Sequence, residues 1–168
     1  MGTVTTDHVD FVLKQWEGQR PDLDMSAMEV IGRLPRLMRF FTAALRRTFG
    51  AHGLDPASFD VLATLYRSEP RSLSPADLMR ASMVTSGAVT QRLDRLESRG
   101  LVTRTPSTSD GRCVRVALTG EGVALMERVL PYHVETENRL LVALDPADRE
   151  ALADTLRDLL VSLGDLPD

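Results

Sequence analysis

The stretch SMVTSGAVTQRLDRLESRGLV, residues 82–102, constrains the fold more than any other part of the chain. Val89, Leu93 and Leu96 recur at helical spacing and fall on one side of a predicted helix. The opposite side carries small or hydrogen-bonding residues: Gly87, Gln91, Asp94 and Ser98, flanked by Thr90 and Arg95. Gly100 suits the left-handed position just after the last turn. We therefore expect a helix that buries an aliphatic side and leaves a polar side for another molecule.

Two shorter helices precede this one, and both begin with the same signal. Asp55-Pro56 and Ser74-Pro75 each place a capping side chain before a proline. Proline fits the first helical position because its missing N–H needs no partner there. Apolar residues then follow at helical steps: Phe59, Val61, Leu62 and Leu65 in the first helix, Leu78 and Met79 in the second.

A pair of strands is predicted after the third helix. Residues 101–105 lead into a polar loop at 106–111, and residues 112–118 alternate between apolar and other side chains. This is the element order of a winged helix-turn-helix domain. In that geometry the third helix enters a DNA major groove about 12 Å wide, and the hairpin tip, here with Arg112, reaches the adjacent minor groove. The predicted fold class is mainly α with a small β-hairpin wing.

Longer helical patterns lie at both ends of the chain. One spans about residues 6–18, and a second runs from Ser26 to about residue 49, interrupted only by Pro35. A third begins at Thr119, and we expect Pro131 to kink it rather than end it. The last begins at Asp145-Pro146 and carries a leucine stripe: Leu152, Leu156, Leu159, Leu160 and Leu163.

These terminal helices carry more apolar surface than a small winged domain can cover. A two-fold dimer would cover that surface and would also match two DNA half-sites on one face of a duplex. We therefore divide the chain into an N-terminal extension helix (1–25), a dimerisation helix (26–55), the winged helix-turn-helix region (56–118) and C-terminal dimerisation helices (119–168).

The uneven distribution of charge bears on the partner. The net charge is −4, yet residues 56–118 carry 9 basic and 6 acidic side chains. Residues 119–168 carry 4 basic and 11 acidic ones. Because exposed charges act over a Debye length of about 8–10 Å, the middle segment can meet phosphates although the whole chain is acidic. Double-stranded DNA is therefore the expected partner.

Other features argue against several classes of protein. No run of about 18 apolar residues exists, and the N-terminal segment lacks the apolar core of a secretory signal, so we expect a cytoplasmic protein with no membrane partner. The single cysteine, Cys113, can form no internal disulfide, and the three scattered histidines give no zinc spacing. No nucleophile motif, phosphate-binding loop or clustered acid–base pair is present. We expect no cofactor, no metal and no catalytic residue.

With these features the chain resembles the MarR family of transcriptional regulators over about residues 28–163. The resemblance is carried by GAVTQRLDRLESRGLVTR at 87–104, Ser109-Asp110-Gly111-Arg112 and VALTGEG at 116–122. It implies that the terminal helices form the dimer and that Arg112 is the wing arginine, oriented by Asp110. It also places a set of residues near DNA: Thr85, Ser86, Thr90, Gln91 and Arg95. Gly111 stands where the family often has a further arginine, so fewer wing contacts are expected.

The chemistry of these side chains indicates different roles. Gln91 and Arg95 can each make two hydrogen bonds to a base edge, of adenine and guanine respectively. Thr90 is expected to meet a phosphate. A solvated helix face with no partner is the alternative, but helix order, hairpin and local charge together favour DNA.

A narrower resemblance concerns the N-terminal segment, with its tryptophan and RPDLD at 20–24. It is similar to the branch of the family that adds a helix and responds to urate or related anions. The ligand residues of that branch are matched here by Trp16, Asp60, Arg92 and Arg104. A guanidinium paired with a carboxylate is a suitable anion receptor, and an indole can cover a flat ligand. The alternatives are helix packing for Trp16 and a structural ion pair between Asp60 and either arginine.

We therefore predict a homodimeric DNA-binding regulator, in the form of a repressor whose affinity for a pseudo-palindromic operator is lowered by a small anion. Urate and related aromatic or carboxylate compounds fit this expectation equally well. One alternative is a regulator of the same fold that needs no ligand or responds to oxidation of Cys113, beside which Arg112 supplies a positive charge. A winged-helix protein-interaction module is the other. It would present apolar residues where this chain has Gln91, Asp94 and Ser98.

Overall fold

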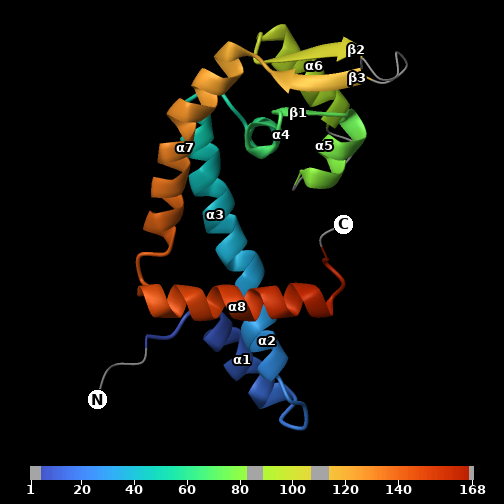
Figure 1. Cartoon of the computed structure of the whole chain (residues 1–168). Coiled ribbons are helices and arrows are strands. Elements are labelled where there is room, and N and C mark those ends of the chain that lie inside the picture. Colours follow the sequence, from blue (N-terminus) through green and yellow to red (C-terminus); the bar gives the residue numbers. More distant parts are fainter. Residues whose placement is uncertain (1–4, 83–88, 107–113, 167–168) are drawn as a thin grey trace. The chain divides into compact units, whose positions relative to one another are not determined.

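The computed structural model describes residues 5–82, 89–106 and 114–166 of the 168-residue chain, apart from the side chains of Val89 and Thr90. The chain forms two compact units, Met1–Ala44 and Leu45–Asp168. Its fold is mainly helical with a small antiparallel sheet, as the sequence predicts (Figure 1).

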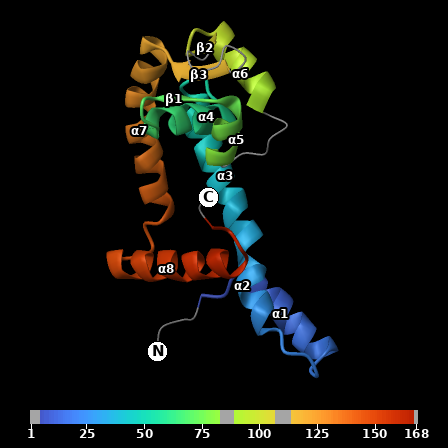
Figure 2. The same cartoon turned by 45° about the vertical axis from the view of Figure 1, so that its right-hand side comes forward.

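The N-terminal unit contains helix α1 (His8–Gln19), helix α2 (Ser26–Ile31) and the first part of helix α3 (Arg33–Gly50). In Figures 1 and 2, α1 and α2 lie side by side. Asp7 caps α1 by accepting hydrogen bonds from the amides of Val9 (2.7 Å) and Asp10 (3.1 Å). Arg33 joins α3 to this cap, because its Nε donates to Asp7 at 2.8 Å and its Nη2 donates to Asp10 at 2.6 Å.

The prediction of one helix from Ser26 to about residue 49 is wrong, because the helix is interrupted at Gly32. Pro35 contributes to the interruption, since it has no N–H to donate to the carbonyl of Ile31. Gly32 also lies close to the preceding turn of α2 and to Val9 of α1. A Cβ atom at this position would lie 2.8 Å from the carbonyl oxygen of Met28 and 3.1 Å from a methyl of Val9.

The Leu45–Asp168 unit begins with the end of α3, followed by α4 (Pro56–Arg67), α5 (Pro75–Ala81) and α6 (Val89–Ser98). The predicted caps of α4 and α5 are confirmed, because Asp55 accepts from the amide of Ser58 at 2.9 Å and Ser74 accepts from the amide of Asp77 at 3.1 Å. These helices enclose one hydrophobic core with the sheet and α7 (Gly120–Leu140): Phe49, Leu54, Phe59, Val61, Leu62, Leu65, Leu78, Leu93, Leu96, Leu101, Val102, Val116, Leu125, Met126 and Val129.

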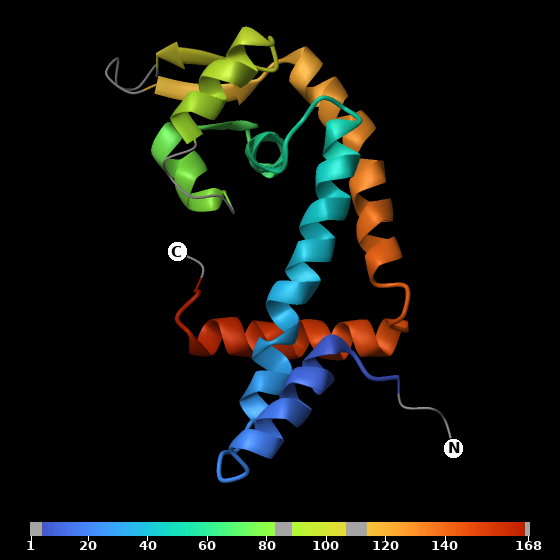
Figure 3. The ribbon, with the colours of Figure 1, turned by 180° about the vertical axis from the view of Figure 1, so that it is seen from behind.

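The sheet has three strands in the order β1–β3–β2, where the sequence predicted two. β2 (Val102–Pro106) and β3 (Val114–Leu118) form the expected antiparallel hairpin, with Val102 opposite Leu118. The additional strand, β1 (Ser72–Leu73), pairs with β3. Its two residues are too few to show an alternating pattern. Arg115 fixes β1 by donating to the carbonyl oxygen of Ser72 at 2.5 Å. Figure 3 shows α6 beside the hairpin.

Two helices complete the chain. Thr119 caps α7, as predicted, by accepting from the amide of Gly122 at 3.0 Å, and Pro131 lies inside this helix without ending it. Asp145 caps α8 (Pro146–Ser162) by accepting from the amide of Asp148 at 2.9 Å. None of the residues of α8 is buried. Among the helices that the structure describes, none is long and apolar enough to cross a membrane.

Candidate nucleic-acid interface and effector pocket

Helix α6 has the two sides that the sequence predicts. Leu93 and Leu96 are 2% and 0% exposed and belong to the core. Gln91, Asp94, Arg95 and Ser98 are exposed on the helix. The Arg95 side chain retains 63% of its accessible surface. The side chains expected to read bases, Gln91 and Arg95, are therefore accessible to another molecule.

A carboxylate at the start of α4 holds the arginines of α6. Arg92 donates from Nη1 to Oδ1 of Asp55, and Nη1 of Arg95 lies 3.9 Å from Oδ2 of the same residue. Asp55 also accepts from the amide and hydroxyl of Ser58, at 2.9 and 3.0 Å. Partial burial of Asp55 tends to raise its pKa, but the hydrogen bonds of Ser58 and the charges of Arg92 and Arg95 outweigh that effect and lower the pKa. Asp55 thus links α4 to α6 as an ionised group.

Arg104 forms a second link to α6, from strand β2. Its Nη2 lies 2.7 Å from Oδ1 of Asp94, and its Nη1 lies 3.3 Å from Oε2 of Glu97. Its backbone amide donates to Oε1 of Glu97 at 3.1 Å. The guanidinium is about one quarter exposed, with 27% of its side-chain surface accessible. Arg104 therefore links α6 to strand β2.

Several predicted DNA contacts lie outside the described residues. These are Thr85, Ser86, Asp110 and Arg112; Thr90 belongs to α6, but its side chain is outside the described part. Cys113, the thiol of the oxidation-responsive alternative, also lies outside the described residues. The predictions for these residues stand on the sequence and the resemblance alone.

A pocket of about 620 Å³ lies between the end of α3, α4 and α7. It is the candidate site for an effector, and we name it the effector pocket. Asp60 lines it, together with Phe49, Phe59, Arg67, His133 and Glu137. The rings of Phe49 and Phe59 stack with centroids 4.1 Å apart, and the ring of His133 lies 4.7 Å from that of Phe59. This volume is within the range of about 300–1,000 Å³ typical of small-molecule sites. The pocket combines aromatic walls with a few charged groups.

The predicted effector residues are distributed over both units. Asp60 lines the effector pocket. In the described part of the chain, Arg92 pairs with Asp55 at the start of α4, and Arg104 pairs with Asp94 of α6. Trp16 belongs to α1 of the N-terminal unit and is 41% exposed. The sequence predicts no role for His133, Arg67 or Asp55 beyond packing and capping. The Asp55-Pro56 cap was the only signal that could have drawn attention to one of them.

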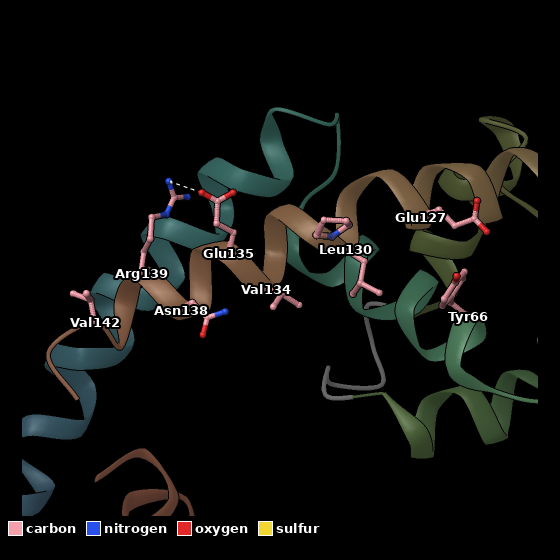
Figure 4. A pocket seen from close by; sticks show the side chains of 9 residues that line it. Tyr66, Glu127, Leu130, Val134, Glu135, Asn138, Arg139 and Val142 are labelled. Atoms are coloured by element: carbon pink, nitrogen blue, oxygen red, sulfur yellow. Dashed lines mark ion pairs between the residues drawn. The ribbon is translucent and has the colours of Figure 1, made fainter. Parts of the chain in front are cut away.

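A second, more open pocket of about 810 Å³ follows α7, as Figure 4 shows. Leu130, Val134 and Val142 provide its apolar surface, with Tyr66 of α4 at one end. Arg139 and Glu135 form an ion pair at 3.8 Å along the same helix. This surface adds to the apolar area that α7 and α8 leave uncovered.

Comparisons with known proteins agree with this geometry. A model described as "MarR family" matches residues 52–112. The chain is 42% identical over 134 residues to the HTH-type transcriptional regulator PecS of Dickeya dadantii, covering 79% of this chain and 81% of that protein.

Two solved structures are similar over most of their length. BpsR of Bordetella bronchiseptica, whose DNA binding is regulated by 6-hydroxynicotinic acid, has 28% identity and a TM-score of 0.69, with 78% of this chain and 98% of that chain covered. A mutant of MarR from E. coli complexed with operator DNA has 27% identity and a TM-score of 0.71, with 81% and 97% covered.

Proposed function

Because this chain belongs to the MarR family of winged helix-turn-helix transcriptional regulators, we propose that it acts as a homodimeric repressor, binds a pseudo-palindromic operator and releases it when a small organic anion binds. As a member of that family it is a DNA-binding regulator and not an enzyme. In this proposal residues 1–25 are an extension helix, 26–55 and 119–168 form the dimer, and 56–118 bind DNA.

The observation that carries the DNA-binding role is the exposed polar side of α6, opposite the buried Leu93 and Leu96. Gln91 and Arg95 are one helical turn apart, so both can face base edges when the helix enters a major groove. Thr85, Ser86 and Thr90 would contact the backbone at the start of the helix, with Arg112 and Asp110 acting from the wing.

The dimer is proposed because α8 has no buried residue and exposes a line of apolar side chains. Leu152, Leu156 and Leu160 are 43%, 40% and 49% exposed. Apolar surface of this extent is costly to leave in water, and a second copy offers the same surface for pairing. Two recognition helices would then reach two half-sites about one helical turn of DNA apart.

The effector is proposed to be an organic anion bound in the effector pocket. The pocket has the size and aromatic walls for a flat ligand, and DNA binding by the similar protein BpsR is regulated by 6-hydroxynicotinic acid, an aromatic carboxylic acid. Asp60 is supported as a contact because it lines this pocket. We propose that Arg92 and Arg104 pass the effect of the ligand to α6, which both of them hold. Trp16 stays a predicted ligand contact on the resemblance alone.

A ligand can lower operator affinity only by as much as it prefers the conformation that does not bind DNA. The test is a mobility shift with the DNA upstream of the protein's own gene, repeated with urate, xanthine, salicylate, aconitate and 6-hydroxynicotinic acid. We expect a specific complex, and at least one of these anions should dissociate it. A protein that binds this DNA no better than a scrambled fragment would contradict the proposed operator.

A further inference from the structure

Arg67 connects the effector pocket with the helix-turn-helix. It is the last residue of α4 and lines the pocket with Asp60 and His133. Its Nη2 donates a hydrogen bond of 2.6 Å to the carbonyl oxygen of Ala81, the last residue of α5. One side chain therefore reaches both the pocket and the end of the helix that precedes α6.

The end of α5 depends on this bond. The carbonyl of Ala81 belongs to the last turn of a helix, where carbonyl groups have no partner within the helix. The next residue, Ser82, donates its amide to Leu78 at 3.0 Å, while its hydroxyl oxygen is buried with no hydrogen-bond partner among the described residues. Helix α6 begins at Val89, so the end of α5 is one anchor of the short connection to the recognition helix.

We propose that Arg67 is the anion receptor of the effector pocket and that its recruitment by the ligand frees the end of α5. The proposal rests on the proposed function, in which an organic anion is the effector. A carboxylate carries a full negative charge and can accept two parallel hydrogen bonds from a guanidinium, whereas the carbonyl of Ala81 is a neutral acceptor. A bound anion therefore competes successfully with the carbonyl of Ala81 for the exposed guanidinium of Arg67.

The same residues define the chemical class of the ligand. Phe49, Phe59 and His133 provide a wall for a planar ring. The carboxylates of Asp60 and Glu137 also line the pocket, so a second negative charge on the ligand would be repelled. These carboxylates instead accept hydrogen bonds. The pocket is thus suited to an aromatic monoanion that carries an N–H or O–H donor away from its anionic group.

The test compares the full-length protein with Arg67→Gln, and with Arg128→Gln as a control. Arg128 is an exposed arginine of α7 that does not line the effector pocket, so its replacement removes the same charge elsewhere. In the free protein, Arg67→Gln should speed hydrogen exchange of the amides of residues 79–82 at least about tenfold, the effect of losing one hydrogen bond from an ionised donor. Calorimetry with 6-hydroxynicotinate and with urate should show at least about a tenfold loss of affinity, because the lost bond is charge-assisted.

Operator binding distinguishes a positioning role of Arg67 from a direct contact between Arg67 and a DNA phosphate. Arg67→Gln should weaken the operator complex without ligand, while the dependence of affinity on salt keeps the slope of the wild type. A phosphate contact would instead reduce that slope by about 1. Arg128→Gln should behave as the wild type in each measurement.

Unchanged amide exchange in Arg67→Gln would overturn the link to α5. If amide exchange is faster in Arg67→Gln but the variant binds 6-hydroxynicotinate or urate as tightly as the wild type does, Arg67 is not the anion receptor. If neither 6-hydroxynicotinate nor urate binds the wild type, the proposed class of effector is wrong. Amide hydrogen exchange and the salt dependence of operator affinity then still decide whether Arg67 stabilises the end of α5.

Discussion

Replacing Asp55 separates two contributions that this one carboxylate makes. It caps α4 through the amide and hydroxyl of Ser58, and it pairs with Arg92 and Arg95 of the recognition helix. Asparagine is as good a helix cap as aspartate and keeps one acceptor oxygen for the amide of Ser58, so Asp55→Asn removes the charge and preserves the cap. With side chains of Asp55 and Arg92 that are 40% and 23% exposed, the ion pairs should contribute about 1 kcal/mol or less to the free energy of unfolding.

Asp55→Ala removes the cap as well, which adds a loss of about 1 kcal/mol, for a total of about 2 kcal/mol. Urea unfolding at pH 7 measures both differences. Asp154→Asn is the matched control, because Asp154 pairs with Arg157 at 2.6 Å on the surface of α8, where both side chains are more than half exposed. It should change stability by less than about 0.5 kcal/mol. Equal stability of Asp55→Ala and Asp55→Asn would refute the capping role. If Asp55→Asn is as stable as the wild type, the ion pairs do not contribute to stability.

The pH dependence of stability is a second test of the ion pairs of Asp55. The pKa of Asp55 is lower in the folded protein than its ordinary value of 3.8. Folding therefore stabilises the ionised form, and this stabilisation is fully present above the unfolded pKa and is lost as the pH falls through the folded pKa. The stability difference between wild type and Asp55→Asn should be constant from about pH 7 to about pH 5 and should shrink below about pH 4. A difference that grows in acid would contradict this assignment.

Three further predictions concern DNA and the dimer. Gln91→Ala should lose about 1–3 kcal/mol of discrimination at one base-pair position, measured by binding to single-substitution operators, and unchanged discrimination would remove Gln91 from base reading. Arg112→Ala should weaken binding to operator and scrambled DNA alike and reduce the salt slope by about 1; a loss confined to the operator would speak against a backbone contact. Leu156→Glu should shift sedimentation from dimer to monomer with unchanged helical circular dichroism, because a charge replaces an exposed apolar side chain of α8; a persistent dimer would exclude α8 from the interface.

Local signals in the sequence were sufficient for most elements of the fold. Asp55-Pro56, Ser74-Pro75 and Asp145-Pro146 each start a helix where predicted, because a cap and a first-turn proline act on the adjacent backbone alone. The two sides of α6 followed from helical periodicity, and Leu93 with Leu96 is buried as expected. The break at Gly32 escaped prediction because the apolar pattern continues through Pro35, although proline lacks the N–H that the carbonyl of Ile31 would need.

The partners of charged groups were decided by the tertiary structure alone. The sequence offered Asp60 as a carboxylate partner for Arg92 or Arg104, yet Asp55 is the carboxylate found against the guanidinium of Arg92, 37 residues away along the chain. Strand β1 forms only because β3 offers it backbone partners, and Arg67 reaches Ala81 only because α4 and α5 pack together. Periodicity and capping act within a few residues, so the sequence by itself determines helices and their apolar sides. Ion pairs, pockets and strand partners join distant residues, and only the packed chain brings these within contact distance.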